Sequence, residues 1–223
     1  MGGRQGVFFV KGYFTKNISP RENGSPIAND YQFLYIMQAI IPPVDKKLLK
    51  QELTSERLLR STNKAGNEIY IVTYQQAPNV MREIGRLREI AFRAAGGGTG
   101  MELDWDEFDT CEHPYYQLIV WDPEEEQILG GYRFLPGSEI KYAADGQPLL
   151  ATSHMFHFSD EFLHTYMADT VELGRSFVTL EYQSTRAMSK GIFALDNLWD
   201  GLGALTVVMH LKFSLRNFIR NFF

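Results

Sequence analysis

The stretch DTVELGRSFV, residues 169–178, combines the pattern of a buried strand with charges that such a strand rarely carries. Its apolar members are of the types that strands favour: Val171, Leu173, Phe177 and Val178. Among them lie the carboxylate of Glu172 and the guanidinium of Arg175. Charged groups in an apolar strand usually face solvent or pair with an opposite charge, and less often they take part in catalysis. The surroundings of Glu172 therefore decide how this strand is packed and what it does.

The composition is that of a globular domain. The chain has 223 residues, of which 44% are apolar and 22% are charged, enough for one core and a small appendage. A net charge of -5 and a pI near 5.6 exclude a general nucleic-acid binder. No stretch approaches the roughly 20 apolar residues of a membrane-spanning helix, and we expect no signal peptide. The single cysteine, Cys111, cannot form an internal disulfide, so we expect a cytoplasmic protein.

Local composition divides the chain into three segments. Residues 1–37 are rich in Asn, Ser, Pro and Gly and predict a poorly structured arm. Residues 38–207 predict one α+β domain. Residues 208–223 place Lys212, Arg216 and Arg220 at four-residue spacing among large apolar side chains, the pattern of a basic amphipathic helix. This tail suits a peripheral contact with the inner face of the membrane; the alternative is a remnant of an interrupted reading frame.

Within residues 38–207 the periodicity predicts a defined order of elements. A short helix begins after Pro42 and Pro43, and a strand follows over 67–74. The clearest helix begins with Asn79 as its N-cap and ends at the glycines 96–98. One face of this helix carries charged residues that we expect in solvent: Arg82, Arg86, Glu89 and Arg93. Runs 115–122 and 127–136 predict a β-hairpin, and Ser159 caps a short helix before the strand at 169–178 and a final helix.

Other candidate sites have simpler interpretations. GGGTG, residues 96–100, follows a helix and lacks the Lys-Ser/Thr pair of a phosphate-binding loop. ELDWDEFD, residues 102–109, lacks the glycine and glutamate of a calcium loop, which leaves a solvated acidic turn or an anionic wall for a cationic amine. His154 and His157 have no third ligand at suitable spacing, so we expect no metal. Arg133 lies inside a strand, where Glu172 and Arg175 are its potential partners if the hairpin and the 169–178 strand are neighbours.

The charged residues occur in an order that resembles a known family. A helix with Arg88 and Phe92 is followed by the acidic pair Asp106 and Asp109, then by Arg133 in a G-x-R strand, and then by the E-x-x-R strand at 172–175. This order resembles acyl-homoserine-lactone synthases and the N-acyltransferases that make ornithine and glycine lipids, both of the GNAT acyltransferase fold. VELGRSFV, ILGGYRFLPG and GIFALDNLWDGLGAL are most similar to the glycine-lipid enzymes, which are often labelled haemolysins. The resemblance covers residues 40–205.

The resemblance implies both a fold and a reaction. The fold is α+β and GNAT-like: a mixed, mainly antiparallel central sheet flanked by helices, which we expect to be incomplete at its C-terminus. The reaction moves a (3-hydroxy) fatty acyl group from an acyl-carrier-protein thioester, or from acyl-coenzyme A, to the amine of glycine or ornithine in aminolipid biosynthesis. No permanently bound cofactor is expected. The alternatives are a lactone-signal synthase that takes S-adenosylmethionine, an acetyl-coenzyme A-dependent acetyltransferase, and a non-catalytic fragment that binds carrier protein or membrane.

The resemblance also implies roles for single residues. Glu172 is the candidate base, and Arg175 and Arg133 either hold an acceptor carboxylate or orient Glu172. The candidates for substrate binding are Arg88, Phe92, Asp106 and Asp109. The phosphopantetheine of the donor is expected at a helix N-terminus after the 169–178 strand, where four residues are available: Gln183, Ser184, Thr185 and Arg186. The GNAT signature Q/R-x-x-G-x-G/A is absent there, which favours acyl carrier protein over coenzyme A.

Overall fold

A computed structural model describes residues 37–63, 65–183, 188–211 and 213–214. Its six strands form one sheet in sequence order: β1 (Leu58–Ser61), β2 (Glu68–Val72), β3 (Tyr116–Asp122), β4 (Gln127–Pro136), β5 (Thr170–Val178) and β6 (Phe213–Ser214). Neighbouring strands from β1 to β5 pair antiparallel, and β6 pairs parallel with β5. The predicted mixed, mainly antiparallel sheet is therefore confirmed. The predicted hairpin is β3 and β4, whereas β1 was not predicted.

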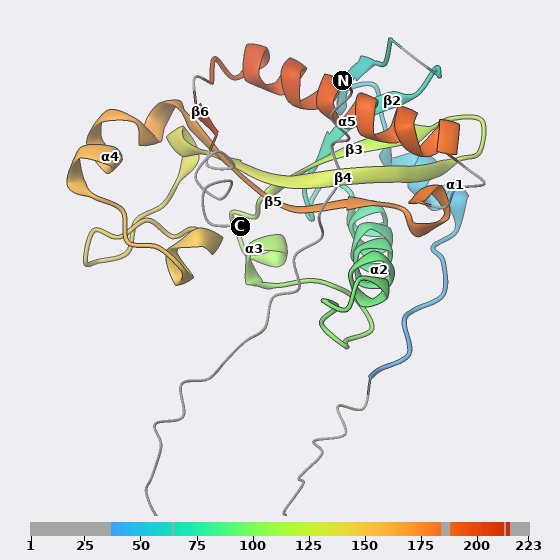
Figure 1. The fold of residues 1–223 in the computed structure, drawn as a ribbon, viewed down its shortest axis with the longest axis horizontal. Helices are drawn as coiled ribbons and strands as arrows, with labels where there is room; N and C mark the ends of the chain where they lie inside the picture. The colour runs from blue at the N-terminus through green and yellow to red at the C-terminus, as the bar shows by residue number, and fades with distance from the viewer. Residues whose placement is uncertain (1–36, 64, 184–187, 212, 215–223) are drawn as a thin grey trace, which may run out of the picture.

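Helices cover the two faces of this sheet (Figure 1). The α-helices are α1 (Lys46–Glu52), α2 (Pro78–Ala94), α3 (Glu107–Thr110), α4 (Asp160–Thr165) and α5 (Met188–Val208). Short 3-10 helices are η1 (Gly137–Glu139), η2 (Ala151–His154), η3 (Met167–Asp169) and η4 (Leu180–Gln183). α1 and α2 pack on one face and α5 on the other. This two-sided cover explains why β3 is buried along nearly its whole length.

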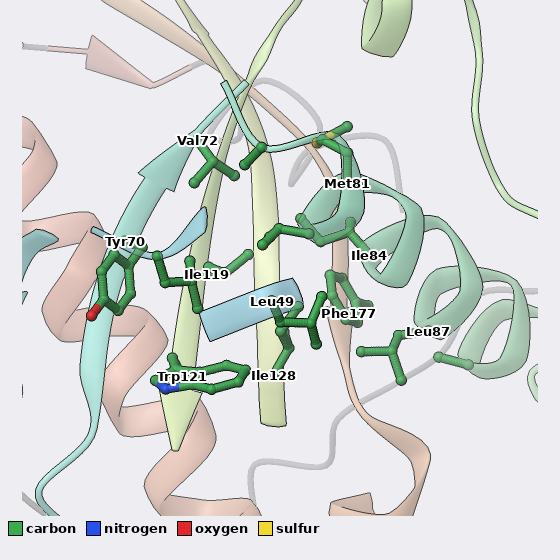
Figure 2. Packing of buried hydrophobic residues seen from close by; sticks show 14 residues of the cluster. Leu49, Tyr70, Val72, Met81, Ile84, Leu87, Ile119, Trp121, Ile128 and Phe177 are labelled. Carbon is green, nitrogen blue, oxygen red and sulfur yellow. The ribbon is translucent and has the colours of Figure 1, made fainter. Parts of the chain in front are cut away.

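The core on the α2 side is built from one face of the strands (Figure 2). One face of α2 is apolar and buried, and Ile84 and Leu87 on this face point at the sheet. Ile119, Trp121 and Phe177 meet them from β3 and β5. The residues that alternate with these along the same strands face α5 instead, because successive side chains of a strand point to opposite faces of the sheet. A third, smaller core lies under η1, η2 and α4 and contains Tyr115 and Leu135.

The strand β5 is interrupted by a bulge at Arg175. Arg133 of β4 pairs with Gly174, but Gly131 pairs with Phe177, so β5 carries one residue more than β4 between these pairs. Arg175 has φ +49°, a left-handed conformation that residues other than glycine seldom adopt. A bulge of this kind redirects a side chain and leaves one residue out of the regular ladder. It places Arg175 on the same side of the sheet as Glu172.

Two expectations about α2 are wrong. The helix begins at Pro78, so Asn79 lies inside the first turn, and the backbone N–H and side-chain amide of Asn79 both donate to Glu52 Oε1. Glu89 is fully buried, not solvated. Its carboxylate accepts the backbone N–H of Gly100 at 2.8 Å and the Thr99 hydroxyl at 2.7 Å. The loop after α2 folds back over this carboxylate and thereby removes it from water.

The two ends of the chain lie largely outside the described residues. This applies to residues 1–36 of the predicted arm and to Lys212, Arg216 and Arg220 of the predicted basic tail. Phe213 and Ser214 form strand β6, which contradicts the helix that we expected at these two residues. Among the described helices, none combines the length and the hydropathy that a membrane span requires.

Candidate active site

Glu172 lies in a buried position on β5, and both of its carboxylate oxygens are hydrogen-bonded. Its side chain is 3% exposed and accepts the hydroxyl hydrogen of Tyr115 at Oε2. Its Oε1 accepts the backbone N–H of Thr152, the second residue of η2, at 2.8 Å. The Tyr115 oxygen in turn accepts the backbone N–H of Ala151 at 3.1 Å. A buried carboxylate requires such donors, because burial without hydrogen bonds would strongly disfavour the ionised form.

Tyr115 connects Glu172 to the lining of a large pocket. The pocket measures about 830 Å³ and lies between α3, β3 and the segment 135–154. Tyr115, Phe108, Leu135 and Leu150 give it an apolar wall, and the exposed Cys111 also lines it. Glu172 is not among the lining residues, although the hydroxyl that binds its carboxylate belongs to a residue that is. Burial and the neighbouring Glu172 raise the pKa of the Tyr115 hydroxyl far above its usual range.

Three arginines and three aspartates form a second, largely buried arrangement beside this pair. We call it the Arg–Asp cluster; its members are Arg88, Arg133, Arg175, Asp104, Asp106 and Asp109. α2, β4 and β5 supply the arginines, and α3 with the residues before it supplies the aspartates. The opposite charges are equal in number, so the cluster is formally neutral. Neutral pairing is the usual way in which charges remain buried in a protein.

The ion pairs run in a chain through the cluster. Arg88 Nη1 lies 3.2 Å from Asp109 Oδ1, and Asp109 Oδ2 lies 3.2 Å from Arg133 Nη1. Arg133 Nη1 also donates to Asp106 Oδ1 at 2.6 Å. Asp106 Oδ2 accepts from Arg175 Nη2 at 2.9 Å, and Arg175 Nη1 donates to Asp104 at 2.6 Å. The chain therefore fixes α2, β4 and β5 to the short α3 segment.

Local hydrogen bonds explain why the acidic turn folds into α3. Asp106 is the N-cap of the helix and accepts the backbone N–H of Phe108, while Asp109 accepts the backbone N–H of Asp106. This reciprocal arrangement is a capping box made from two aspartates. It holds the carboxylates at the positions where the arginines arrive. Of the two alternatives for this segment, the solvated acidic turn is wrong, because Asp104 and Asp109 have no exposed surface.

Burial and ion pairing act in opposite directions on the pKa values of these groups. Burial raises the pKa of Asp104, and Arg175 and Arg88 only partly offset this. Burial acts on Asp106 in the same direction, but Arg133 and Arg175 outweigh it and lower the pKa of Asp106 to about 2. Burial lowers the pKa of Arg88 against the pull of Asp109. Asp106 is therefore the firmly ionised centre of the cluster at neutral pH.

The structure rearranges the predicted pairs. Glu172 was expected to pair with Arg133 or Arg175, but both guanidiniums bind aspartates and Glu172 binds Tyr115 and η2. The Glu172–Tyr115 pair and the Arg–Asp cluster are nevertheless neighbours. The guanidinium carbon of Arg133 lies 5.1 Å above the centre of the Tyr115 ring. Arg175 is the most open arginine of the cluster, with 28% of its side chain exposed. The catalytic roles of Glu172, Arg133 and Arg175 remain predictions.

The remaining predicted residues are dispersed. Arg88 is fully buried and also donates to Gln117 of β3, so its predicted contact with substrate would require a rearrangement. Phe92 packs against the core on the α2 side, outside the Arg–Asp cluster. Gln183 ends η4, and its side-chain amide donates to the carbonyl of Val178 at 2.6 Å. Ser184, Thr185 and Arg186 lie outside the described residues. In the described part of the chain, no three His, Cys, Asp or Glu side chains are grouped to hold a metal ion.

Sequence reasoning missed Tyr115 and Gln117, which complete the two arrangements. Gln117 donates to Asp109 at 3.1 Å and accepts from Arg88, inside a strand that otherwise reads as apolar. A lone amide in such a strand is a usable signal, since a buried amide needs partners. Tyr115 offers no comparable signal, because tyrosine is common at strand ends whether or not its hydroxyl has a role.

Comparisons with known proteins match this chain to one family description and to two named relatives. Residues 87–191 match the family described as "Acetyltransferase (GNAT) domain". A protein named glycine N(alpha)-acyltransferase from Bacteroides thetaiotaomicron is 72% identical over 173 residues, which cover 78% of this chain and 51% of that relative. A protein of the same name from Phocaeicola vulgatus is 67% identical over 172 residues, which cover 77% of this chain and 53% of the relative. This chain thus spans about half the length of these curated relatives. No solved structure matches it significantly.

The matched region includes most of α2, the Arg–Asp cluster, the bulged strand β5 and the start of α5. The mixed sheet of the chain, flanked by helices, has the architecture that the GNAT resemblance implies, and the matched region contributes β3, β4 and β5. Residues 87–191 of this chain are therefore similar to an acetyltransferase domain of the GNAT type.

Proposed function

We propose that this chain transfers a fatty acyl group from a thioester to the amine of glycine. The observation that carries the proposal is its 72% identity, over 173 residues, to a protein named glycine N(alpha)-acyltransferase. The geometry supports it independently: a buried carboxylate lies behind a pocket with a largely apolar wall, as amine acylation with a lipid-like donor would require. Because the chain spans about half of that relative, activity of this chain is itself part of the proposal.

The proposed chemistry begins with removal of a proton. The amine of an amino acid is mostly protonated at neutral pH, and only the free amine attacks a thioester. Glu172 accepts this proton, and the free amine then attacks the thioester carbonyl carbon. As the C–S bond breaks, a second proton passes from the nitrogen to the departing sulfur, which leaves an amide and a thiol. General-base assistance of this kind contributes typically 10²–10⁴-fold to the rate. The hydrogen bonds from Tyr115 and Thr152 hold the carboxylate in one orientation for this step.

The bulge in β5 is the proposed site of the thioester carbonyl. An extra residue at a bulge is left out of the ladder, so a backbone N–H near Arg175 can donate to the developing oxyanion. One well-placed donor of this type contributes about 3 kcal/mol to transition-state stabilisation. Arg175 is the member of the cluster most accessible to the acceptor carboxylate. Arg133, Arg88 and the aspartates would then act by holding this end of the sheet in place.

The donor and the pathway are the finer parts of the proposal. We propose a 3-hydroxyacyl chain carried by acyl carrier protein, with acyl-coenzyme A as the alternative donor, bound near Gln183 and the start of α5. The product would enter aminolipid biosynthesis, at a cytoplasmic location on the inner face of the membrane. The apolar lining of the pocket supports a lipid-like substrate, because such pockets recover the free energy of burying methylene groups.

The test is direct synthesis of the product. The folded chain is incubated with 3-hydroxyacyl carrier protein or 3-hydroxyacyl-coenzyme A and with glycine, ornithine or S-adenosylmethionine, and the products are identified by mass spectrometry. We expect N-acylglycine, lost in Glu172→Gln. Formation of N-acylornithine or of a lactone instead would reassign the acceptor. Absence of any acyl product, with tight binding of carrier protein, would indicate the non-catalytic alternative.

A further inference from the structure

We propose that Tyr115 is the catalytic group that contacts the acceptor amine and passes its proton to Glu172. This inference rests on the proposed function and adds the identity of the group that the substrate meets. It follows from the placement of two residues: Tyr115 lines the pocket, whereas Glu172 lies behind it with both carboxylate oxygens occupied. An amine in the pocket therefore reaches the Tyr115 oxygen before it reaches the carboxylate.

The Tyr115 hydroxyl retains the capacity that a relay requires. A phenolic oxygen can donate one hydrogen bond and accept two. Tyr115 donates to Glu172 and accepts from the Ala151 N–H at 3.1 Å, which leaves one lone pair for an N–H of the substrate. The transfer balances: the N–H bond breaks as a new O–H forms on Tyr115, and the original Tyr115 O–H breaks as the proton bonds to Glu172. Tyr115 begins and ends the step as a neutral phenol.

Packing holds this hydroxyl in place without help from a substrate. The Tyr115 ring is 3% exposed and meets Phe108 edge-on, with ring centroids 5.3 Å apart. The Arg133 guanidinium lies over the same ring at 5.1 Å, so the Arg–Asp cluster packs against one face of the Tyr115 ring. Burial and the nearby Glu172 raise the pKa of Tyr115, which agrees with a neutral relay and disfavours a phenolate base. A fixed donor–acceptor pair is what efficient proton transfer needs.

The next residue in the chain provides a matched control. Tyr116 also lines the pocket, but its hydroxyl donates to Glu139 at 2.9 Å. This hydrogen bond is exposed to solvent. Tyr115→Phe and Tyr116→Phe each remove one hydroxyl and keep a ring in the wall. Only the first breaks the connection to Glu172. Any difference between the two variants therefore reports on that connection.

The experiment measures N-acylglycine formation by the whole chain as a function of pH. We expect Tyr115→Phe to lower kcat by about 10²-fold at pH 7 with a much smaller change in KM, and the deficit to shrink as rising pH frees the amine. Tyr116→Phe removes a pocket hydroxyl that has no connection to Glu172, so any deficit of this variant should be independent of pH. Full activity of Tyr115→Phe, or a loss that does not vary with pH, would overturn the relay while leaving the acyltransferase intact. Absence of product from the wild type would instead refute the proposed function.

A second measurement does not depend on whether Tyr115→Phe folds. The rate of the wild type is measured in mixtures of H₂O and D₂O under conditions where amine acylation limits turnover. Two protons that move together give a bowed dependence of rate on deuterium fraction, and one proton gives a straight line. The relay predicts the bowed dependence, and a straight line would refute it. Thermal unfolding of Tyr115→Phe, compared with Tyr116→Phe, identifies any loss that comes from damage to the fold.

Discussion

Replacing Asp109 with asparagine tests whether the Arg–Asp cluster holds the site together. The side chain keeps its size and loses its charge. Asp109 has no exposed surface and lies 3.2 Å from both Arg88 Nη1 and Arg133 Nη1. Arg133 keeps a second carboxylate, Asp106, at 2.6 Å. Arg88 keeps only the neutral Gln117 among the partners found in the described residues, so its fully buried charge would lose its ion pair.

The magnitude follows from that unpaired charge. Removing one member of a buried ion pair typically destabilises a protein by about 3–5 kcal/mol. The free energy of unfolding of a domain is about 5–15 kcal/mol in total, so Asp109→Asn should lose a substantial share of it. Arg88→Met combined with Asp109→Asn removes the stranded cation as well. The double variant should therefore recover at least about 1 kcal/mol relative to additive behaviour.

Urea unfolding, followed by circular dichroism, measures these differences. Glu126→Gln is the control, because Glu126 pairs with Lys50 on the exposed surface and its loss should produce no measurable change. A loss below about 1 kcal/mol in Asp109→Asn would refute the reasoning, since it would place Arg88 in a solvated environment. Purely additive behaviour of the double variant would show that Arg88 and Asp109 are not energetically coupled.

Three further predictions concern the pocket, the acid limb of stability and a close backbone approach. Cys111 is exposed and lines the pocket, so its alkylation with N-ethylmaleimide should abolish N-acylglycine formation. The variant Cys111→Ser should be active, and N-ethylmaleimide should not inhibit it. Full activity after complete alkylation of Cys111 would exclude the pocket as the substrate site. Because the folded-state pKa of Asp106 is lowered to about 2, below about 3.9 in unfolded chains, its stabilising contribution is complete above pH 4 and disappears as the pH falls toward 2. Asp106→Asn should flatten the fall in unfolding free energy across that window, and an unchanged slope would contradict the ion pairs. Gly137→Ala should lower stability by about 1–3 kcal/mol in urea unfolding, because its Cβ would collide with the Met167 carbonyl; an unchanged midpoint would contradict that contact.

The fold was largely predictable because its main elements have strong local patterns. The hairpin of β3 and β4 and the strand β5 show apolar runs bounded by turn residues, and Ser159 caps α4 as expected. β1 was missed because it is short and carries Arg60 and Ser61 at its end, which read as a turn. The burial of Glu89 was missed because helix periodicity cannot show that a distant loop supplies hydrogen bonds to a charged face.

Several charged residues of the Arg–Asp cluster were singled out from the sequence, but their pairing was not. Each predicted arginine and aspartate of the cluster is present, yet the partners are up to 71 residues apart in sequence, as for Arg175 and Asp104. Many pairings of like residues are compatible with one sequence, and only the register of β4 against β5 and the bulge at Arg175 select among them. Tyr115 became visible only when the pocket and the carboxylate were both in place.

The most direct test of the central claim is the pH dependence of N-acylglycine formation by the wild type and Glu172→Gln. If Glu172 takes the proton of the amine, the variant should be about 10²–10⁴-fold slower at pH 7, and the two rates should converge as the amine loses its proton in alkaline solution. Equal rates at pH 7 would contradict the account, since the buried carboxylate on β5 would then have no part in the reaction.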